Sequence, residues 1–310
     1  MKSIGGYFEL ECGKTPPYYS DGFYLNSGRN ALRYIVRGLG LKQIYAPRYT
    51  CSVIFEAFHQ ENCEIKFYDL DKEFFPNQNI PANEFIIYNN YFGVTGTKVK
   101  QMSEIYPNLI VDNAQAFYSP LTERASIYSP RKFFGLPDGG ILRGKDIPLI
   151  NINKGTSYNV MSHLLKRIDL GPTEGYEDFR KNAEKISDYP VEKMSELTET
   201  LMGNIDYKEA KEKRIANFYY LKSELPTLFP ISMDSDDVPL VYPFLVKNGE
   251  ELRKKLISQK IFCAQYWPDV LSDCNKESME YNLVKNIVAL PIDQRYSISE
   301  MSQIISAIKK

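Results

Sequence analysis

The stretch NLIVDNAQA, residues 108–116, combines the most apolar strand candidate of the chain with an aspartate at its end. A short run of Leu, Ile and Val between polar residues is typical of a strand buried inside a parallel sheet. Ligands of such sheets bind at the carboxyl ends of the strands, which is where Asp112 stands. With Gln115 three residues further on, this carboxylate could hold a protonated ring nitrogen; a simple loop cap is the alternative.

Strand and helix patterns alternate on both sides of this stretch. We expect helices at 28–39, 51–60 and 98–106, and strands at 43–47, 64–68, 84–88, 108–112, 125–129 and 140–143. Such alternation predicts an α/β fold in which a mostly parallel sheet carries helices on both faces.

The pattern changes near residue 150. Two helices are expected next, at 176–188 and 193–224, and the second is long and charged. A smaller α/β unit follows, with strand patterns at 240–246, 260–266 and 286–291 and helices at 249–258 and 298–309. We therefore predict a large domain at 1–190, followed at 191–310 by a long linking helix and a small C-terminal domain.

The composition narrows the classes of function. The 310 residues carry 38 basic and 39 acidic side chains, so no overall positive charge attracts nucleic acid or an anionic membrane. The opening MKSIGGYFELE has no apolar run, and we expect no signal peptide. Five cysteines, an odd number without a C-x-x-C pair, are expected to be reduced thiols, which favours the cytoplasm.

Metal and hydrolase chemistry are not expected. The two histidines, His59 and His163, are interpreted as surface or packing residues, which leaves no clustered ligands for zinc. A Ser-His-Asp hydrolase would need one of them and a G-x-S-x-G elbow, which the chain lacks. The acidic DSDD at 234–237 is interpreted as a solvated loop.

The segment SGRNAL at 27–32 is a glycine turn that leads into a helix. The free backbone amides and the positive dipole end of such a helix bind phosphate. A plain helix cap without a ligand is the alternative for this segment.

The segment SPRKFFGLPDGG at 129–140 contains Lys132 in an aromatic, glycine-flanked setting. A lysine in an apolar pocket has a destabilised ammonium, so the neutral amine that forms a Schiff base is accessible. A lysine in a surface turn is the alternative. The three segments together favour a site for pyridoxal 5'-phosphate (PLP).

Taken together, these segments resemble the DegT/StrS group of nucleotide-sugar aminotransferases, which are fold-type-I PLP-dependent enzymes. The family has a Ser-Gly-Thr-x-Ala-Leu turn, an Asp-x-x-Gln-Ala strand end, and a lysine segment that closes in Asp-Gly-Gly. YNNYFG at 88–93 is similar to its Val-His-x-Tyr-Gly, with Asn90 in place of histidine. The regions 193–206 and 286–305 resemble its Met-Ser-Glu-Leu helix and its C-terminal segment, so the likeness covers most of the chain.

The resemblance implies a role for each matching residue. Lys132 would form the internal aldimine with PLP and later move the substrate proton. Asp112 would pair with the pyridinium nitrogen, which keeps the ring an electron sink, and Gln115 would lie near the ring hydroxyl. An aromatic residue of APRYTC would stack on the ring; Tyr49 is the choice, and a shift of one residue gives Thr50. The phosphate would be bound by these residues at the glycine turn: Ser27, Gly28 and Arg29.

Two positions depart from the family pattern. The phosphate-binding serine five residues before the lysine is Ile127 here, and Ser129 is the candidate replacement. The family's Asn-Tyr-Arg, which reaches into the neighbouring subunit's site, is replaced by Val-Glu-Lys at 191–193. Asn159 is the candidate replacement for that asparagine.

The implied function is transfer of an amino group, from glutamate, to a keto-sugar nucleotide in a homodimeric enzyme. Enzymes of this family act in the synthesis of surface polysaccharides or of secondary metabolites, and the resemblance does not decide between these two pathways. One alternative is another PLP reaction such as sugar dehydration, but Lys132 counts against it because known relatives with that activity have histidine there. The other is a divergent protein of the same fold with a binding or regulatory role.

Overall fold

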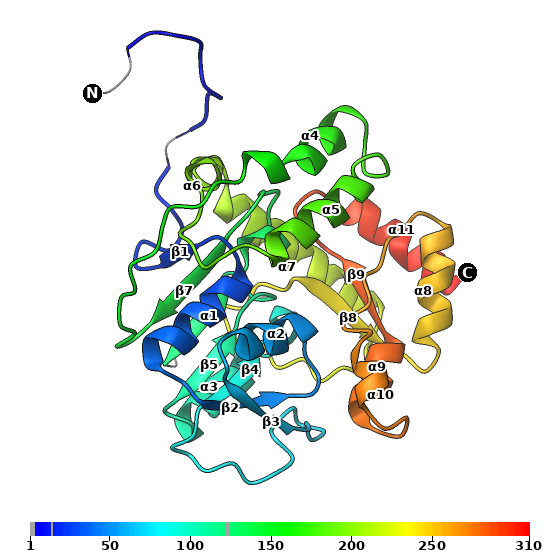
Figure 1. The fold of residues 1–310 in the computed structure, drawn as a ribbon. Coiled ribbons are helices and arrows are strands. Elements are labelled where there is room, and N and C mark those ends of the chain that lie inside the picture. The colour runs from blue at the N-terminus through cyan, green and yellow to red at the C-terminus, as the bar shows by residue number, and fades with distance from the viewer. Residues whose placement is uncertain (1–3, 14, 122–123) are drawn as a thin grey trace.

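A mixed sheet lies at the centre of the larger part of the molecule (Figure 1). The computed structural model describes residues 4–13, 15–121 and 124–310, and within these ranges seven strands form this sheet in the order β1-β7-β6-β5-β4-β2-β3. The strands are β1 (Phe23–Leu25), β2 (Gln43–Pro47), β3 (Glu64–Tyr68), β4 (Ile86–Asn89), β5 (Leu109–Asp112), β6 (Ala125–Tyr128) and β7 (Gly140–Gly144). Strands β2 to β6 are mutually parallel, and β7 runs antiparallel to β6 and β1. The predicted mostly parallel α/β sheet is confirmed.

Helices follow the strands as the sequence pattern predicts. They are α1 (Gly28–Leu39), α2 (Ser52–Gln60) and α3 (Gly96–Ile105). The first begins where expected because the Ser27 side chain accepts a hydrogen bond from the Asn30 amide. It ends at Gly40, whose φ of 63° is the left-handed conformation that glycine tolerates.

Alternate side chains of the strands pack on opposite faces of the sheet. Ile87 and Ile110 belong to the core cluster that also contains the buried residues of α1 and α2. Their neighbours Tyr88 and Val111 point to the other face, where the core includes residues of α3 and of the C-terminal part. Both faces of the sheet are therefore covered by packed side chains, and only the ends of the strands are free to form a site.

The last part of the predicted large domain contains a pair of helices. The predicted helix at 176–188 is confirmed as α5 (Tyr176–Ser187), and an unpredicted helix, α4 (Ser162–Asp169), precedes it. His163 lies between them, with its Nδ1 2.9 Å from the carboxamide nitrogen of Asn182, and is a packing residue as expected.

The single long helix predicted at 193–224 is wrong. Two helices occupy this range, α6 (Glu196–Met202) and α7 (Tyr207–Glu224). The chain turns at Gly203, and a new helix starts because the Asp206 side chain accepts from the Glu209 amide. The continuous charged pattern predicted one helix, although Gly203-Asn204 forms a turn and Asp206 caps a second helix.

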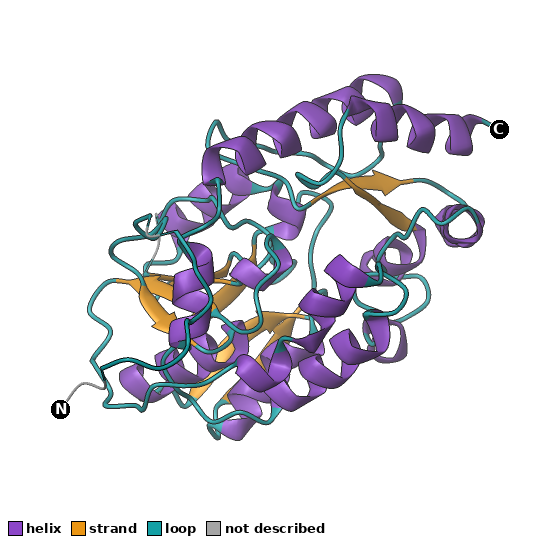
Figure 2. Cartoon of the chain, turned by 90° about the horizontal axis from the view of Figure 1, so that it is seen from above, coloured by secondary structure: helices purple, strands orange, loops and turns teal. Residues whose placement is uncertain are grey.

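The C-terminal part has its own antiparallel pair of strands, β8 (Val241–Leu245) and β9 (Ile287–Pro291), set apart from the large sheet (Figure 2). Its helices are α8 (Gly249–Ser258), α9 (Val270–Asp273), α10 (Met279–Asn286) and α11 (Ile298–Lys309). The strand expected at 260–266 is not formed; a single bridge joins Ala264 to Ala289. The domain boundary at residue 190 stays a prediction.

The acidic segment at 234–237 is not wholly solvated. Asp237 is buried, and its carboxylate accepts a hydrogen bond from the Gly96 amide at 2.9 Å, at the start of α3. Burial raises the pKa of Asp237 to about 6. The interpretation as a loop holds for its exposed neighbours Ser235 and Asp236.

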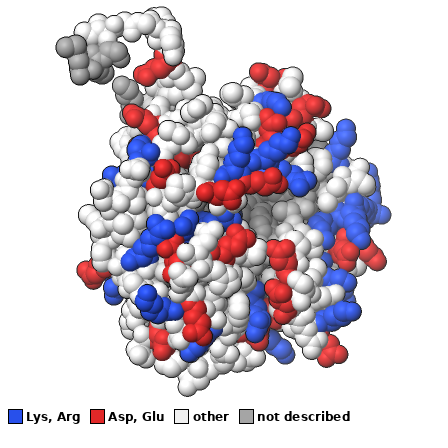
Figure 3. Space-filling model, viewed as in Figure 1, with Lys and Arg blue, Asp and Glu red and all other residues white. Residues whose placement is uncertain are grey.

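The charged surface is mixed in sign. Figure 3 shows basic and acidic side chains interspersed over the viewed face, in keeping with a net charge of -1. Among the described residues, no helix is both long enough and apolar enough to cross a membrane.

Candidate active site

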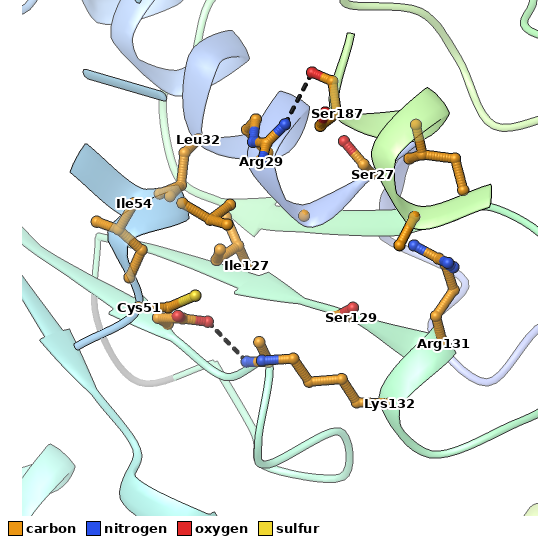
Figure 4. Close-up of a pocket in the computed structure, with 16 residues that line it drawn as sticks. Ser27, Arg29, Leu32, Cys51, Ile54, Ile127, Ser129, Arg131, Lys132 and Ser187 are labelled. Atoms are coloured by element: carbon orange, nitrogen blue, oxygen red, sulfur yellow. Dashed lines mark hydrogen bonds between the residues drawn. The ribbon is translucent and has the colours of Figure 1, made fainter. Parts of the chain in front are cut away.

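A cavity of about 240 Å³ lies at the carboxyl ends of β5 and β6, beside the first turn of α1. Its walls come from segments far apart in the sequence, including the glycine turn, the end of β5 and the lysine segment (Figure 4). Six of the residues predicted for the site line it: Ser27, Gly28, Arg29, Asp112, Ser129 and Lys132.

Lys132 ends a short 3₁₀ turn, Pro130–Lys132, and its amide donates to the Ser129 carbonyl at 3.1 Å. The lysine is exposed, whereas the following residues Phe133 and Phe134 are buried in the core. The lysine is therefore less buried than expected: the turn sends the aromatic rings into the core and the lysine into the cavity, whose wall includes the apolar Ile54 and Ile127.

The lysine segment is held from behind by the C-terminal part of the chain. The Phe133 carbonyl accepts from Gln294 at 2.8 Å and from Arg214 at 3.4 Å. The buried Arg214 guanidinium also lies over the Phe133 ring, 4.5 Å from its centroid. These contacts fix the backbone next to Lys132.

Asp112 stands at the end of β5, as predicted, and faces the cavity. One carboxylate oxygen accepts from the Ala114 amide at 2.8 Å, which orients the group. Burial raises the pKa of Asp112, while the charge of Lys132 and the amide hydrogen bond act to lower it. A cationic ligand group beside this carboxylate would oppose the effect of burial and bring the pKa down.

The start of α1 forms the opposite end of the cavity. Helix N-terminal amides have no partner within the helix, and the dipole favours an anion there. Ser129 lies close by, because a methyl group added at Gly28 would come within 3.8 Å of its Cβ. The hydroxyl groups of Ser27 and Ser129 therefore share this end of the cavity with the helix terminus.

The Asp-Gly-Gly at residues 138–140, which ends the lysine segment, packs against the start of α1 and against α6. The buried Asp138 carboxylate accepts from the Ser195 amide at 3.1 Å and from its hydroxyl at 2.9 Å, and also from the Thr198 hydroxyl. A Cβ on Gly140 would lie 2.2 Å from the Ser27 carbonyl oxygen. Glycine is required here because two backbones are in direct contact.

Three residues expected in the site do not line the cavity. Tyr49 is fully buried, stacked on Tyr91 with ring centroids 5.4 Å apart and packed edge-on against Trp267. Gln115 is also buried, and its carboxamide oxygen accepts from the Phe92 amide at 2.8 Å. Asn159 is exposed in a separate shallow polar pocket.

Thr50, the alternative to Tyr49, and Asn90, which stands where the resembling family has histidine, do not line the cavity either. Thr50 is buried, and its hydroxyl accepts from the Asn89 side chain at 2.7 Å. Asn90 donates to Asn113 and to Ser119. Both belong to the scaffold under the strand ends.

Sequence reasoning missed several residues of the wall. Cys51, the last residue of APRYTC, lies beside Asp112 and Lys132, whose charges both act on its pKa. Burial has the largest effect and raises the pKa of the thiol. Arg131 also lines the cavity, and its position next to Lys132 was the available signal. The end of α5 covers the cavity with Ala183, Ile186 and Ser187, which no local pattern indicated.

Comparison with solved structures identifies the architecture. CalS13 from Micromonospora echinospora, a sugar aminotransferase, aligns with a TM-score of 0.59 at 13% identity, over 93% of this chain and 87% of that one. The chain has the fold of the sugar aminotransferases. NtdA from Bacillus subtilis, solved with bound cofactor PMP, gives a TM-score of 0.63 at 14% identity, over 95% and 74% of the two chains.

A DegT DnrJ EryC1 StrS aminotransferase from Brucella abortus also matches, with a TM-score of 0.59 at 16% identity, over 93% of this chain and 85% of that one. No protein-family model matches the chain, and no curated protein matches it in sequence. The resemblance to the DegT/StrS group is thus confirmed at the level of the fold.

Proposed function

We propose that this chain is a PLP-dependent aminotransferase that acts on a keto-sugar nucleotide. The observation that carries the proposal is the cavity itself, which joins Lys132, Asp112 and the start of α1. It brings an amine, a carboxylate and an anion-binding helix end together from three separate segments.

The residues present fit the cofactor. An anion-binding end with two serine hydroxyls suits its phosphate, and a carboxylate at the other end suits its ring nitrogen. The cavity is smaller than the roughly 300 to 1,000 Å³ of drug-sized ligand sites, which suits a small ring with a phosphate. When bound, PLP supplies an electron sink for proton removal next to an amine.

The side chains of the chain would divide the work. The Lys132 amine would attach the cofactor and, once released, carry the proton at its Nζ between two carbon atoms. Asp112 would hold a proton on the ring nitrogen, and the Ala114 amide keeps its carboxylate aimed. The hydroxyls of Ser27 and Ser129 and the backbone amides of Gly28 and Arg29 would hold the phosphate end.

Glutamate as donor, a nucleotide-linked keto-sugar as acceptor and a pathway for a surface polysaccharide or secondary metabolite are finer parts of the proposal. The likeness to CalS13, a sugar aminotransferase, supports an amino transfer to a sugar, and the likeness to the Brucella aminotransferase supports amino transfer in general. A cytoplasmic location stays a prediction from the cysteines.

A homodimer is also part of the proposal. Large apolar side chains are exposed on the two elements that contact α5, namely Tyr158 of the 3₁₀ turn Tyr158–Val160 and Ile168 of α4, which are 77% and 81% exposed. Apolar surface of this kind marks a protein contact, and a second copy of the chain is the partner we propose. Light scattering of the purified protein tests this.

The central experiment follows the visible absorption of the protein with PLP before and after borohydride reduction. We expect a reducible cofactor adduct on Lys132, identified by mass spectrometry, and no such adduct in Lys132→Ala. Lys132→Arg is the matched control, since it keeps the positive charge without the attaching amine. The same reducible adduct in Lys132→Ala would refute the proposal.

Ile127 favours a second candidate, a protein of this fold that binds the cofactor without transferring amino groups. Its apolar side chain lines the cavity at the position where the resemblance leads us to expect a serine. Glutamate added to the PLP-loaded protein separates the two functions. An aminotransferase forms pyridoxamine phosphate stoichiometrically, whereas a binding protein forms none.

A further inference from the structure

Two arginines line the cavity, and they differ in the partners that they already have. Arg29 donates through Nη1 to the Ser187 carbonyl at 2.7 Å and forms an ion pair with Glu56 at 2.9 Å. Its charge is therefore balanced within the protein. Arg29 thus ties α1 to α5 and has little charge left for a ligand.

Arg131 differs in its terminal guanidinium nitrogens. Its Nε, like that of Arg29, is buried and has no hydrogen-bond partner within the described ranges 4–13, 15–121 and 124–310, but unlike Arg29 its guanidinium has no hydrogen bond or ion pair of any kind there. A buried guanidinium donor without an acceptor is costly, so such a group indicates a missing partner. Burial lowers the pKa of Arg131, and the charge of Asp138 raises it.

The neighbours of Arg131 do not remove this deficit. The Asp138 carboxylate already accepts from Ser195 and Thr198. His163 faces Arg131 from α4, and burial and the arginine charge both lower the pKa of this histidine, which disfavours a second cation there. A ligand in the cavity, which Arg131 lines, can supply the missing acceptor.

The direction of the side chain identifies the end of the cavity that it serves. Figure 4 shows Lys132 extending toward Cys51, whereas Arg131 extends toward the end where Ser27 and Ser187 lie. Ser129 lies between the two basic side chains. Arg131 thus stands at the anion-binding end with the helix start, and away from the carboxylate of Asp112.

The geometry points to Arg131 as the charged ligand of the cofactor phosphate, acting with Ser129 and the first turn of α1. This inference rests on the proposed function. A guanidinium can donate two parallel hydrogen bonds to phosphate oxygens, and the bond is charge-assisted. It also compensates for Ile127, which presents no hydroxyl group at this wall.

The test compares PLP with pyridoxal, which has the same ring and aldehyde but no phosphate. Dissociation constants of both compounds are measured by absorption titration of the cofactor-free protein. In Arg131→Gln we expect PLP binding to weaken about 10- to 100-fold, the size of one charge-assisted hydrogen bond, and pyridoxal binding to change less than about threefold. Arg131→Lys, which keeps the charge without the planar fork, should recover part of the PLP affinity.

The matched control is Arg180→Gln, the same chemical change at an exposed arginine of α5, which should leave both constants unchanged. Thermal unfolding of each variant separates ligand binding from folding. Equal weakening of PLP and pyridoxal would overturn the assignment, since it indicates a structural role. So would unchanged PLP affinity with a raised requirement for glutamate, which would assign Arg131 to the donor carboxylate.

The outcome for the unaltered protein keeps the two proposals apart. If it binds PLP and Arg131→Gln binds PLP equally well, only the arginine assignment fails. If the unaltered protein forms no adduct with either compound, the proposed function fails, and the assignment fails with it.

Discussion

Asp112 and Asp138 stand on either side of Lys132 in the sequence, and burial raises the pKa of both. Their hydrogen bonds differ. The Asp138 carboxylate accepts from three protein groups, two hydroxyls and an amide, whereas in the described part of the chain the Asp112 carboxylate accepts only from the Ala114 amide. The contrast teaches that a satisfied carboxylate belongs to the scaffold, and one with acceptor capacity left in a cavity belongs to the site.

The largest expected effect is at the site carboxylate. Asp112→Asn should lower the rate of amino transfer at least ~1,000-fold, because a neutral amide does not hold a proton on the ring nitrogen. The unfolding free energy should change by less than about 1 kcal/mol, since the amide oxygen can still accept from Ala114. Steady-state kinetics and chemical denaturation measure the two quantities.

The exposed Asp146→Asn is the control for this change and should leave the rate unaltered. If the Asp112→Asn protein keeps more than a tenth of the rate, Asp112 is not the carboxylate that acts on the cofactor, and the contrast with Asp138 fails.

The scaffold carboxylate should respond in the opposite way. Asp138→Ala should lower the unfolding free energy by about 3 kcal/mol, because the buried Ser195 amide loses its acceptor and the Ser195 and Thr198 hydroxyls lose their charged partner. Asp138→Asn keeps one acceptor and should cost less. If Asp138→Ala instead unfolds like the unaltered protein in urea, the carboxylate is not a structural tie.

Asp237 is a third buried carboxylate, and its raised pKa makes its contribution to the unfolding free energy depend on pH. Its folded pKa is about 6, above the ordinary value of 3.8, so between these values the folded state holds a proton that the unfolded state releases. Stability contributed by this group is therefore present below pH 4 and lost as the pH rises to about 6, by up to about 3 kcal/mol. Asp237→Asn should lack this part of the pH dependence.

Unfolding free energies measured from pH 4 to pH 7 give the difference curve between Asp237→Asn and the unaltered protein. The exposed neighbour variant Asp236→Asn should follow the unaltered protein throughout. Parallel curves for Asp237→Asn and the unaltered protein would show that Asp237 does not titrate in this range.

The smallest expected effect is at the backbone contact that joins scaffold and site. Gly140→Ala should cost about 2 kcal/mol of stability, because its Cβ would overlap the Ser27 carbonyl. It should also weaken PLP more than pyridoxal, since the overlap displaces the start of α1. Gly135→Ala is the control, because Gly135 also lies outside the left-handed region and an added Cβ would make only an ordinary contact with Leu164 at 3.5 Å. Equal stability of Gly140→Ala and the unaltered protein would contradict the close contact.

Much of the fold was predictable because local chemistry and tertiary structure agree in this chain. The Ser27 cap, the apolar run before Asp112 and the alternating strands each specify their element from nearby residues. The predictions were wrong where a single turn or buried residue lies within a longer run of charged residues that suggests a different structure. The charged run after residue 193 concealed the turn at Gly203, and an acidic run concealed the burial of Asp237.

For the candidate site, the sequence by itself determined the lysine, the strand-end aspartate and the helix start, because each depends on its position within one element. Only the tertiary structure decided which side chains turn toward the cavity. It buried Tyr49 against Tyr91, exposed Lys132, and paired Arg29 while leaving Arg131 without an acceptor. Burial and pairing depend on groups brought together from distant segments, and a linear pattern carries no record of them.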